Sequence, residues 1–266
     1  MKKNSFFTIV LLFLFAFLFF YGMIELLMMR FRTGDAYPPY SSYRPDPQGT
    51  KAFYEALSRL HGINVKRNVE SLDNISGGSE ATLFLFGLRR SDFSLMRQSC
   101  VKRLEDAANR GGRIVITFVP AEDDSAFFPG GEKGNEAQED DEPKTQNKEE
   151  KKERHDEEFV DLARRWAVAI EWAARTKGEA VLTAPEKELP VSVVWPGRLT
   201  FNPGDDAWRI LYSRGGHPVI MERSYGKGRI VLSSESFFLS NEAMKDKRYP
   251  HLLSWLCGDR PTIIFD

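Results

Sequence analysis

The sequence predicts an α/β fold: a mostly parallel sheet covered by helices on both faces, with a β-hairpin addition and an N-terminal transmembrane helix. Three continuous apolar runs have the length of buried strands, ATLFLF at 81–86, RIVITFV at 113–119 and RIVLS at 229–233. An amphipathic helical pattern at 92–110 joins the first two runs. Strands that are apolar on both faces and joined by helices are typical of parallel sheets buried between helical layers.

The N-terminal region is an apolar segment. After a short tail at 1–5, residues 6–29 contain one charged side chain, Glu25. Because about 20 apolar residues are enough to cross a bilayer, we expect a transmembrane helix at 6–29. The alternative is a cleaved signal peptide, which usually has an apolar region of about 7–15 residues followed by a small-residue cleavage site that this sequence lacks. The basic residues on the two sides of the segment slightly favour a cytoplasmic N-terminus, which predicts a single-pass inner-membrane protein with its domain outside.

The rest of the chain, 38–266, is predicted to be one α/β domain interrupted by a charged insertion. Residues 132–158 hold twelve acidic and six basic side chains and no aromatic residue. Such a segment cannot bury enough apolar surface to offset the entropy of ordering it. The sequence therefore predicts a disordered insertion at about 122–158, either a solvated loop or an acidic segment that binds a cation or a partner.

Two further helices are predicted from capping and spacing. Asp46 as N-cap and Pro47 at the first helical position predict a helix that ends near Gly62. A helix is also predicted at 159–174, because Leu162, Trp166, Ile170 and Ala173 are spaced along one helical face.

The C-terminal part predicts mainly strands. Short β-rich pieces separated by Pro-Gly and Gly-Gly indicate hairpins at 191–222. Gly226-Lys227-Gly228 precedes a strand rather than a helix, so we interpret it as a hairpin turn and not as a phosphate loop. A helix with a break near Pro250 is predicted at 237–257, and a last strand at 261–265.

Composition excludes several classes of protein. The formal net charge is −1, which excludes a generally basic nucleic-acid binder. Two cysteines and four histidines exclude a disulfide-stapled scaffold and a Cys/His-rich zinc module. A nucleophile elbow of the form Gly-x-Ser-x-Gly or Gly-x-Cys-x-Gly does not occur, and Cys100 and Cys257 fall on apolar helical positions typical of core thiols. We predict no metal site and no cofactor.

Polar residues at the predicted carboxyl ends of strands form the candidate binding site. Open α/β sheets bind ligands at that edge, and two arginines there could hold an anion. The alternative is that these residues make only local ion pairs and caps. The candidate ligand-binding residues are Tyr43, Arg44, Arg89, Ser234, Glu235 and Asn241.

Three stretches resemble the domain-of-unknown-function 4350 family. They are SSYRPDPQGTKAFYEAL at 41–57, the strand–helix–strand run at 83–118 and GKGRIVLSSESFFLSN at 226–241. The resemblance implies a class I glutamine-amidotransferase-like fold in a membrane-anchored protein. It also implies genes beside those of MoxR-type AAA ATPases and transglutaminase-like membrane proteins, with no reaction assigned.

Two hypotheses of function follow. The first is a membrane-anchored, non-catalytic binding or assembly subunit that works with a MoxR-type AAA ATPase and other membrane proteins. The second is an envelope hydrolase or transferase with Glu235 as a base and Arg89 as an anion clamp. The residues LRR that follow Gly87 at the end of the 81–86 strand contain no nucleophile, which favours the first hypothesis.

Overall fold

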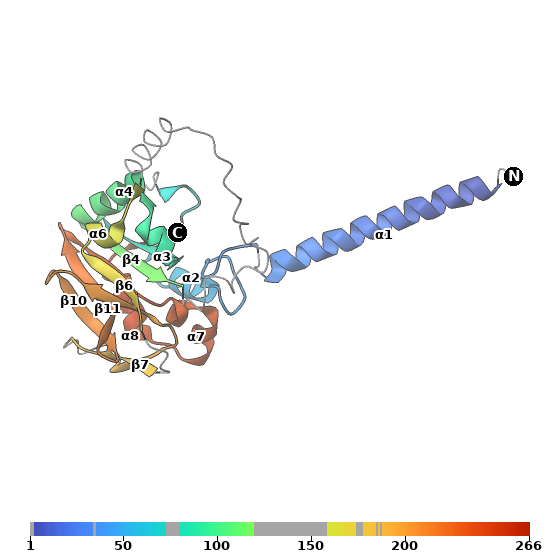
Figure 1. The fold of residues 1–266 in the computed structure, drawn as a ribbon. Coiled ribbons are helices and arrows are strands. Elements are labelled where there is room, and N and C mark those ends of the chain that lie inside the picture. The colour runs from blue at the N-terminus through green and yellow to red at the C-terminus, as the bar shows by residue number, and fades with distance from the viewer. Residues whose placement is uncertain are drawn as a thin grey trace, which may run out of the picture.

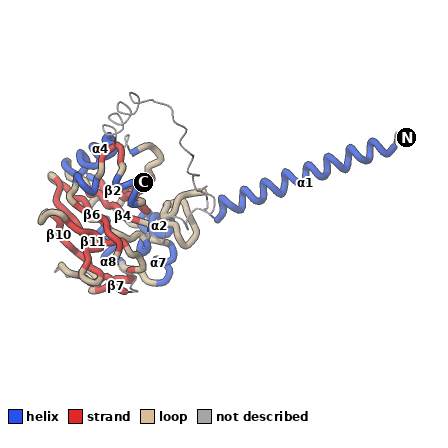
Figure 2. The backbone as a smooth tube through the Cα atoms, viewed as in Figure 1, coloured by secondary structure: helices blue, strands red, loops and turns tan. Residues whose placement is uncertain are grey.

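The protein is described by a computed structural model that covers residues 3–33, 36–72, 80–119, 159–173, 178–184, 186 and 188–266. The first helix, α1 (Lys3–Thr33), projects away from the folded domain (Figures 1 and 2). Within it, Val10–Met29 is apolar and long enough to cross a membrane, with a mean hydropathy of 2.4. Length and composition of this kind are typical of a membrane span or of a signal sequence.

A single large sheet dominates the domain. Among the described residues, nine strands form it. In spatial order they are β1 (Asn64–Arg67), β13 (Thr262–Phe265), β2 (Ala81–Leu88), β4 (Arg113–Phe118), β12 (Gly228–Ser233), β11 (His217–Tyr225), β10 (Trp208–Arg214), β7 (Gly178–Leu182) and β8 (Ser192–Trp195). Neighbours from β1 to β12 are parallel. Neighbours from β12 to β8 are antiparallel.

The predicted mostly parallel sheet covered by helices on both faces is therefore wrong: the sheet is mixed. The hairpin strands do not form a separate addition, because β11 pairs with β12 along its length, from Ile220–Ser233 to Tyr225–Gly228. Gly226 and Lys227 form the two-residue turn between these strands, as predicted, and so tight a turn makes them antiparallel neighbours. The β-rich half thus extends the parallel half into one sheet.

Two apolar cores lie on the two faces of this sheet. Helices cover one face, and its core includes Phe53, Phe84, Phe265 and Leu256. The second face carries helices and a β-ribbon, and its core includes Leu104, Phe118 and Trp166. On the first face lie α2 (Lys51–Ser58), η3 (Phe237–Leu239), α7 (Asn241–Asp246) and α8 (Pro250–Cys257). On the second lie α3 (Arg90–Ser94), α4 (Gln98–Asn109), α6 (Leu162–Arg165) and the ribbon of β6 (Val168–Trp172) and β9 (Leu199–Pro203).

The helix predicted at 159–174 is largely a strand. The structure has β5 (Phe159–Val160), paired with β3 (Met96–Arg97), then the short α6 and then β6. Burial along β6 alternates, with Val168 and Ile170 buried and Ala169 exposed. A spacing of four residues places side chains on one face of a strand as well as of a helix, so the pattern did not distinguish the two.

Other predictions have mixed outcomes. The helix predicted to start after Asp46 begins at Lys51, with Thr50 as its N-cap. Cys100 and Cys257 are buried, which confirms them as core thiols. The charged insertion predicted at about 122–158 lies outside the described residues.

Candidate functional site

The carboxyl ends of β2, β4 and β12 meet at a buried polar cluster. The Ser236 hydroxyl donates to the carbonyl oxygen of Phe118 at 2.7 Å and lies 2.7 Å from Thr117 Oγ1. The backbone N–H of Gly87 donates to the same hydroxyl at 3.2 Å. One serine side chain therefore connects the ends of three parallel strands.

Glu235 lies beside this cluster, and its side chain is fully buried. Its Oε1 accepts a hydrogen bond from the backbone N–H of Phe237 at 3.0 Å. Its Oε2 faces Gly197, where a Cβ atom would be only 2.1 Å away. Burial raises the pKa of the Glu235 carboxyl to about 8, although backbone N–H groups and the Arg214 charge oppose the shift. The carboxyl is thus sealed inside the domain.

Residues 36–50, here called the capping segment, cover this edge of the sheet. Tyr40 is 4% exposed, has a positive φ of 62° and lies against Gly87, whose Cβ would be 3.0 Å from the Tyr40 ring. Thr50 Oγ1 donates to the Tyr40 carbonyl at 2.9 Å, and the Tyr40 N–H donates to Gln48 at 2.7 Å. The chain itself therefore occupies the position above the strand ends where open sheets usually bind ligands.

Arg44 and Asn241 belong to the attachment of the capping segment. The guanidinium of Arg44 is paired with Asp46 and donates to the Tyr37 carbonyl at 3.1 Å. Asn241 Nδ2 donates to the carbonyls of Arg44 at 2.9 Å and Asp46 at 2.5 Å. Arg44 and Asn241 are therefore in contact, because the Asn241 side-chain amide bonds the Arg44 backbone carbonyl. They do not line an open binding site together.

The remaining sequence-predicted residues lie in different surroundings. Ser234 is buried next to Glu235, and its N–H donates to Val219 at 2.9 Å. Tyr43 is 40% exposed, stacks on Tyr37 at 5.1 Å and lies 4.3 Å from the Arg67 guanidinium. Arg89 is exposed at the start of α3, where its N–H donates to Asp92 at 3.3 Å.

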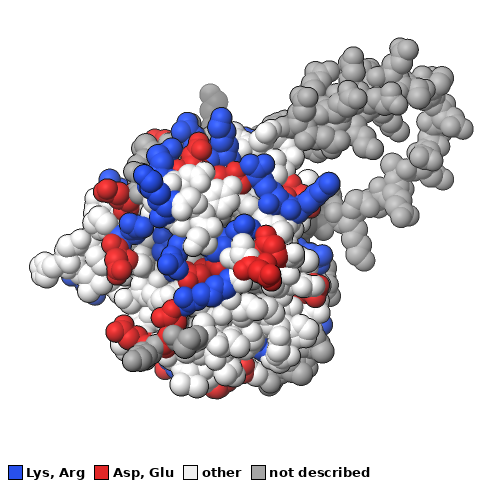
Figure 3. Space-filling model, turned by 90° about the vertical axis from the view of Figure 1, so that its left-hand side faces the viewer, with Lys and Arg blue, Asp and Glu red and all other residues white. Residues whose placement is uncertain are grey.

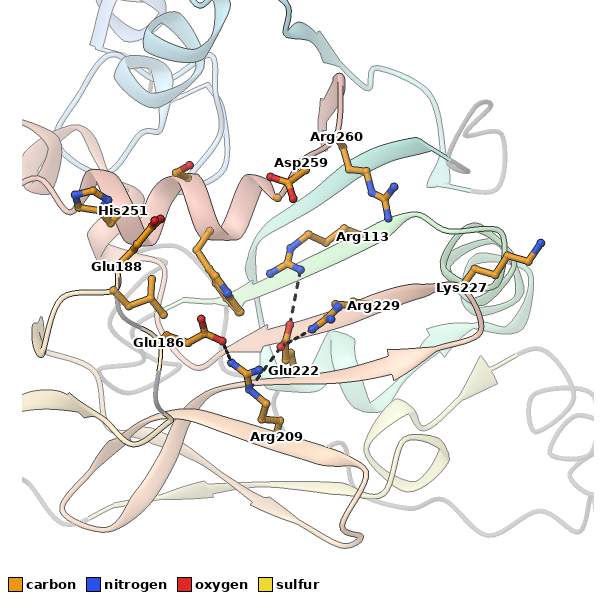
Figure 4. A pocket seen from close by; sticks show the side chains of 14 residues that line it. Arg113, Glu186, Glu188, Arg209, Glu222, Lys227, Arg229, His251, Asp259 and Arg260 are labelled. Atoms are coloured by element: carbon orange, nitrogen blue, oxygen red, sulfur yellow. Dashed lines mark hydrogen bonds and ion pairs between the residues drawn. The ribbon is translucent and has the colours of Figure 1, made fainter.

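The opposite, amino edge of the sheet carries a cavity of about 850 Å³. Strands β4, β10, β11 and β12 form one wall, and α8 with the turn that follows it forms another (Figure 4). Charged side chains dominate the lining: Arg113, Arg209, Lys227, Arg229 and Arg260 are basic, Glu186, Glu188, Glu222 and Asp259 are acidic, and His251 and Trp255 come from α8.

This cavity was not predicted, although the sequence contains a signal for it. The sequence Arg-Ile-Val occurs at 113–115 in β4 and at 229–231 in β12, and the two strands pair in parallel with Arg113 opposite Arg229. Two arginines are thus neighbours at one strand edge. Glu222 on β11 completes the cluster: it accepts a hydrogen bond from Arg229 Nη1 at 2.7 Å.

The cavity does not have the ligand set of a metal centre. Within the described part of the chain, no group of three or more His, Cys, Asp or Glu side chains is arranged to hold a metal ion.

Burial lowers the pKa of the Arg113 guanidinium to about 10, although the Glu222 carboxylate opposes the shift. The floor of the cavity is thus a poorly solvated cationic group.

Comparisons with solved structures give distant likenesses. The N-terminal domain of mmIFT52 is 12% identical, with a TM-score of 0.41, over 79% of this chain and 92% of that domain. The exo-β-1,4-mannosidase Op5Man5 from Opitutaceae bacterium strain TAV5 is 15% identical, with a TM-score of 0.37, over 68% of this chain. The β-galactosidase from Bacillus circulans sp. alkalophilus is 13% identical, with a TM-score of 0.32, over 64%. The chain spans 25% of the mannosidase and 23% of the β-galactosidase.

Comparison with curated proteins gives no match. A family profile, in contrast, matches residues 42–257, which include the capping segment from Ser42 onward, the parallel strands other than β13, and α8. The chain therefore belongs to the family described as Domain of unknown function (DUF4350).

Proposed function

We propose that the protein is a membrane-anchored, non-catalytic binding or assembly subunit. In this proposal α1 holds the domain at the inner membrane, with the domain outside, and the domain binds a partner protein. The resemblance stated above supplies the candidate partners: the domain contacts the associated membrane proteins and works through them with a MoxR-type AAA ATPase on the cytoplasmic side.

The observation that supports a non-catalytic role is the covered carboxyl edge. Catalysis at Glu235 would require the carboxyl to come within hydrogen-bond distance of a substrate proton. Glu235 is instead fully buried, and Tyr40 of the capping segment is packed against Gly87 at the same edge. The alternative of a hydrolase or transferase that uses Glu235 and Arg89 would require the capping segment to leave.

The anchor is tested by charge substitutions in the middle of α1. A charged residue at the centre of a membrane helix costs about 2.5–3.5 kcal/mol on insertion scales. Phe17→Arg combined with Leu18→Arg should therefore move the protein from the membrane fraction to the soluble fraction. The matched control, Phe17→Leu with Leu18→Ile, should stay in the membrane. A wild-type protein found in the soluble fraction, or with its N-terminus removed near residue 30, would contradict the anchor.

The binding role is tested by mild crosslinking in membranes followed by co-purification of the full-length protein. We expect a MoxR-type ATPase or an associated membrane protein to be recovered with wild type and with Glu235→Gln, because the carboxyl is not accessible. If hydrolytic turnover is found and Glu235→Gln abolishes it, the enzyme alternative holds instead.

A further inference from the structure

The cavity at the amino edge of the sheet contains a cluster of charged side chains in which arginines outnumber carboxylates. Glu222 is nearly fully buried, and three guanidinium groups surround its carboxylate. Arg229 Nη1 lies 2.7 Å from it, Arg113 Nη1 3.7 Å and Arg209 Nε 3.8 Å. Arg209 is also paired with Glu186. Arg113 and Arg229 therefore share a single buried carboxylate, which leaves positive charge uncompensated.

Two polar atoms in this cluster lack hydrogen-bond partners among the described residues. They are Arg113 Nη2, a donor, and Glu222 Oε2, an acceptor. Arg113 itself is 8% exposed, with its Nε bonded to the Leu256 carbonyl at 3.0 Å and its guanidinium 4.5 Å from the Trp255 ring. A buried polar atom without a partner is costly, so the pair favours a ligand that both accepts and donates hydrogen bonds and that reaches these atoms when neighbouring side chains move.

Further cations lie on the same side of the cavity. Figure 4 shows Lys227 and Arg260, together with the carboxylate of Asp259, on the side of Arg113 and Arg229, whereas Glu188 and His251 lie at the other end. The face of the molecule in Figure 3 likewise carries many Lys and Arg side chains with Asp and Glu among them. The cationic end is suited to an anionic group, and the other end leaves room for the remainder of a small molecule.

We propose that this cavity binds the phosphate group of a small molecule, either inorganic phosphate or a phosphomonoester. A phosphate that retains one proton offers oxygens to the arginines and an O–H to Glu222. Sulfate has similar size and charge but no proton at neutral pH, so its oxygens would face the Glu222 carboxylate. The Arg209 and Arg229 side chains are 45% and 51% exposed and can rotate to admit the ligand. This site is separate from the covered carboxyl edge, so it does not depend on the proposed membrane role.

The proposal is tested by calorimetric titration of the full-length protein in detergent micelles with inorganic phosphate, glycerol 3-phosphate and sulfate. We expect phosphate or the phosphomonoester to bind in the millimolar range or tighter, and sulfate to bind at least about tenfold more weakly. The tighter of the first two identifies the source of the phosphate group. Absence of binding by both, or sulfate binding as tightly as phosphate, would overturn the proposal.

Variants separate this site from general attraction by positive charge. Arg229→Gln and Arg260→Gln should each weaken phosphate binding by about tenfold, the typical loss for a hydrogen bond to a charged group. Arg103→Gln, an exposed position on α4 away from the cavity, should bind as wild type does. Glu222→Gln removes the repulsion and should reduce the preference for phosphate over sulfate to less than about threefold. Unchanged binding in both Arg229→Gln and Arg260→Gln would refute the site, and a melting curve for each variant confirms that it is folded.

Discussion

Asn241, the first residue of α7, donates a hydrogen bond from Nδ2 to the backbone carbonyl of Arg44 at 2.9 Å, although the two residues are 197 positions apart. The same amide accepts a hydrogen bond at Oδ1 from the N–H of Ala52 at 2.8 Å, and its backbone N–H donates to Gly49 at 2.7 Å. Asn241 thus fastens the end of the capping segment and the start of α2 to the C-terminal part of the domain.

Replacing Asn241 by alanine should detach this end of the capping segment. The change leaves the carbonyls of Arg44 and Asp46 and the N–H of Ala52 without partners, so we expect a loss of about 2–3 kcal/mol in the free energy of unfolding. Chemical denaturation measures it, and limited proteolysis should show faster cleavage within 36–50. Asn202→Ala, which removes one exposed side-chain contact to Glu171, is the control and should cost less than about 1 kcal/mol. Equal losses in the two variants would contradict the role of Asn241.

The buried Glu235 carboxyl should make stability fall as the pH rises. Its pKa is about 8 in the folded protein, above the ordinary value of 4.5, so the folded state retains a proton that the unfolded state releases between these values. The stabilising contribution is complete below about pH 4.5 and is lost as the pH rises toward 8. Glu235→Gln, an analogue of the protonated acid, should be more stable than wild type at pH 8 by about 4 kcal/mol and similar at pH 4.5. Parallel melting curves for the two proteins would show that Glu235 does not titrate in this range.

Gly197 should not tolerate a methyl group. A Cβ there would lie 2.1 Å from Glu235 Oε2, and the buried carboxyl cannot move into solvent. We expect Gly197→Ala to destabilise the protein by more than about 2 kcal/mol. At Gly178 the nearest atom would be 3.7 Å away, an ordinary contact, so Gly178→Ala should change the midpoint of urea unfolding little. A similar midpoint shift in both variants would show that the space around Glu235 adapts.

The pair between Glu105 and Arg165 should contribute to stability at neutral pH. Arg165 donates to the carboxylate in a bidentate arrangement, from Nε at 2.6 Å and from Nη2 at 2.7 Å, and Trp166 donates at 3.1 Å. Burial raises the pKa of Glu105, but these hydrogen bonds outweigh burial and hold it below its usual value.

Glu105→Gln should therefore cost about 1–3 kcal/mol at pH 7. This difference should disappear as acid protonates the wild-type carboxyl below its ordinary pKa of 4.5. Glu55→Gln, which removes an exposed contact 3.9 Å from Lys51, is the control and should cost less than about 0.5 kcal/mol. Thermal unfolding at pH 7 and pH 3 measures the stability of both variants. If Glu105→Gln is still less stable than wild type at pH 3, the ion pair is not the cause of the loss.

Local sequence patterns predicted the individual strands of the parallel half, but they did not predict how all the strands pair. The segments predicted as strands at 81–86, 113–119 and 229–233 correspond to β2, β4 and β12, because short apolar segments flanked by glycine are typical of buried strands. The pairing of the hairpin strands with β12 depends on contacts distant in sequence, and so the mixed sheet was not predicted. For Leu162, Trp166 and Ile170 the spacing of four fitted helix and strand equally.

The candidate site was predicted only in part, because its surroundings also depend on contacts distant in sequence. Position at a strand end correctly indicated that Ser234 and Glu235 follow β12, but composition could not show that Tyr40 would be buried at the same edge. The cluster of Arg113, Arg229 and Glu222 was not predicted, because it lies toward the amino ends of the parallel strands and a ligand site was expected at their carboxyl ends. The Arg-Ile-Val sequence that β4 and β12 share indicates the cluster once the parallel pairing of these strands is assumed.

The short connection between α1 and the capping segment limits how far the domain can move from its anchor. Six residues lie between Thr33 at the end of α1 and the buried Tyr40, and the seven Cα-to-Cα steps between them span about 25 Å at most when fully extended. With α1 embedded in a bilayer, as proposed, this short connection keeps the covered strand ends near the lipid headgroups. The charged cavity lies at the other ends of the same strands, so the length of the domain separates it from the strand ends that the anchor holds.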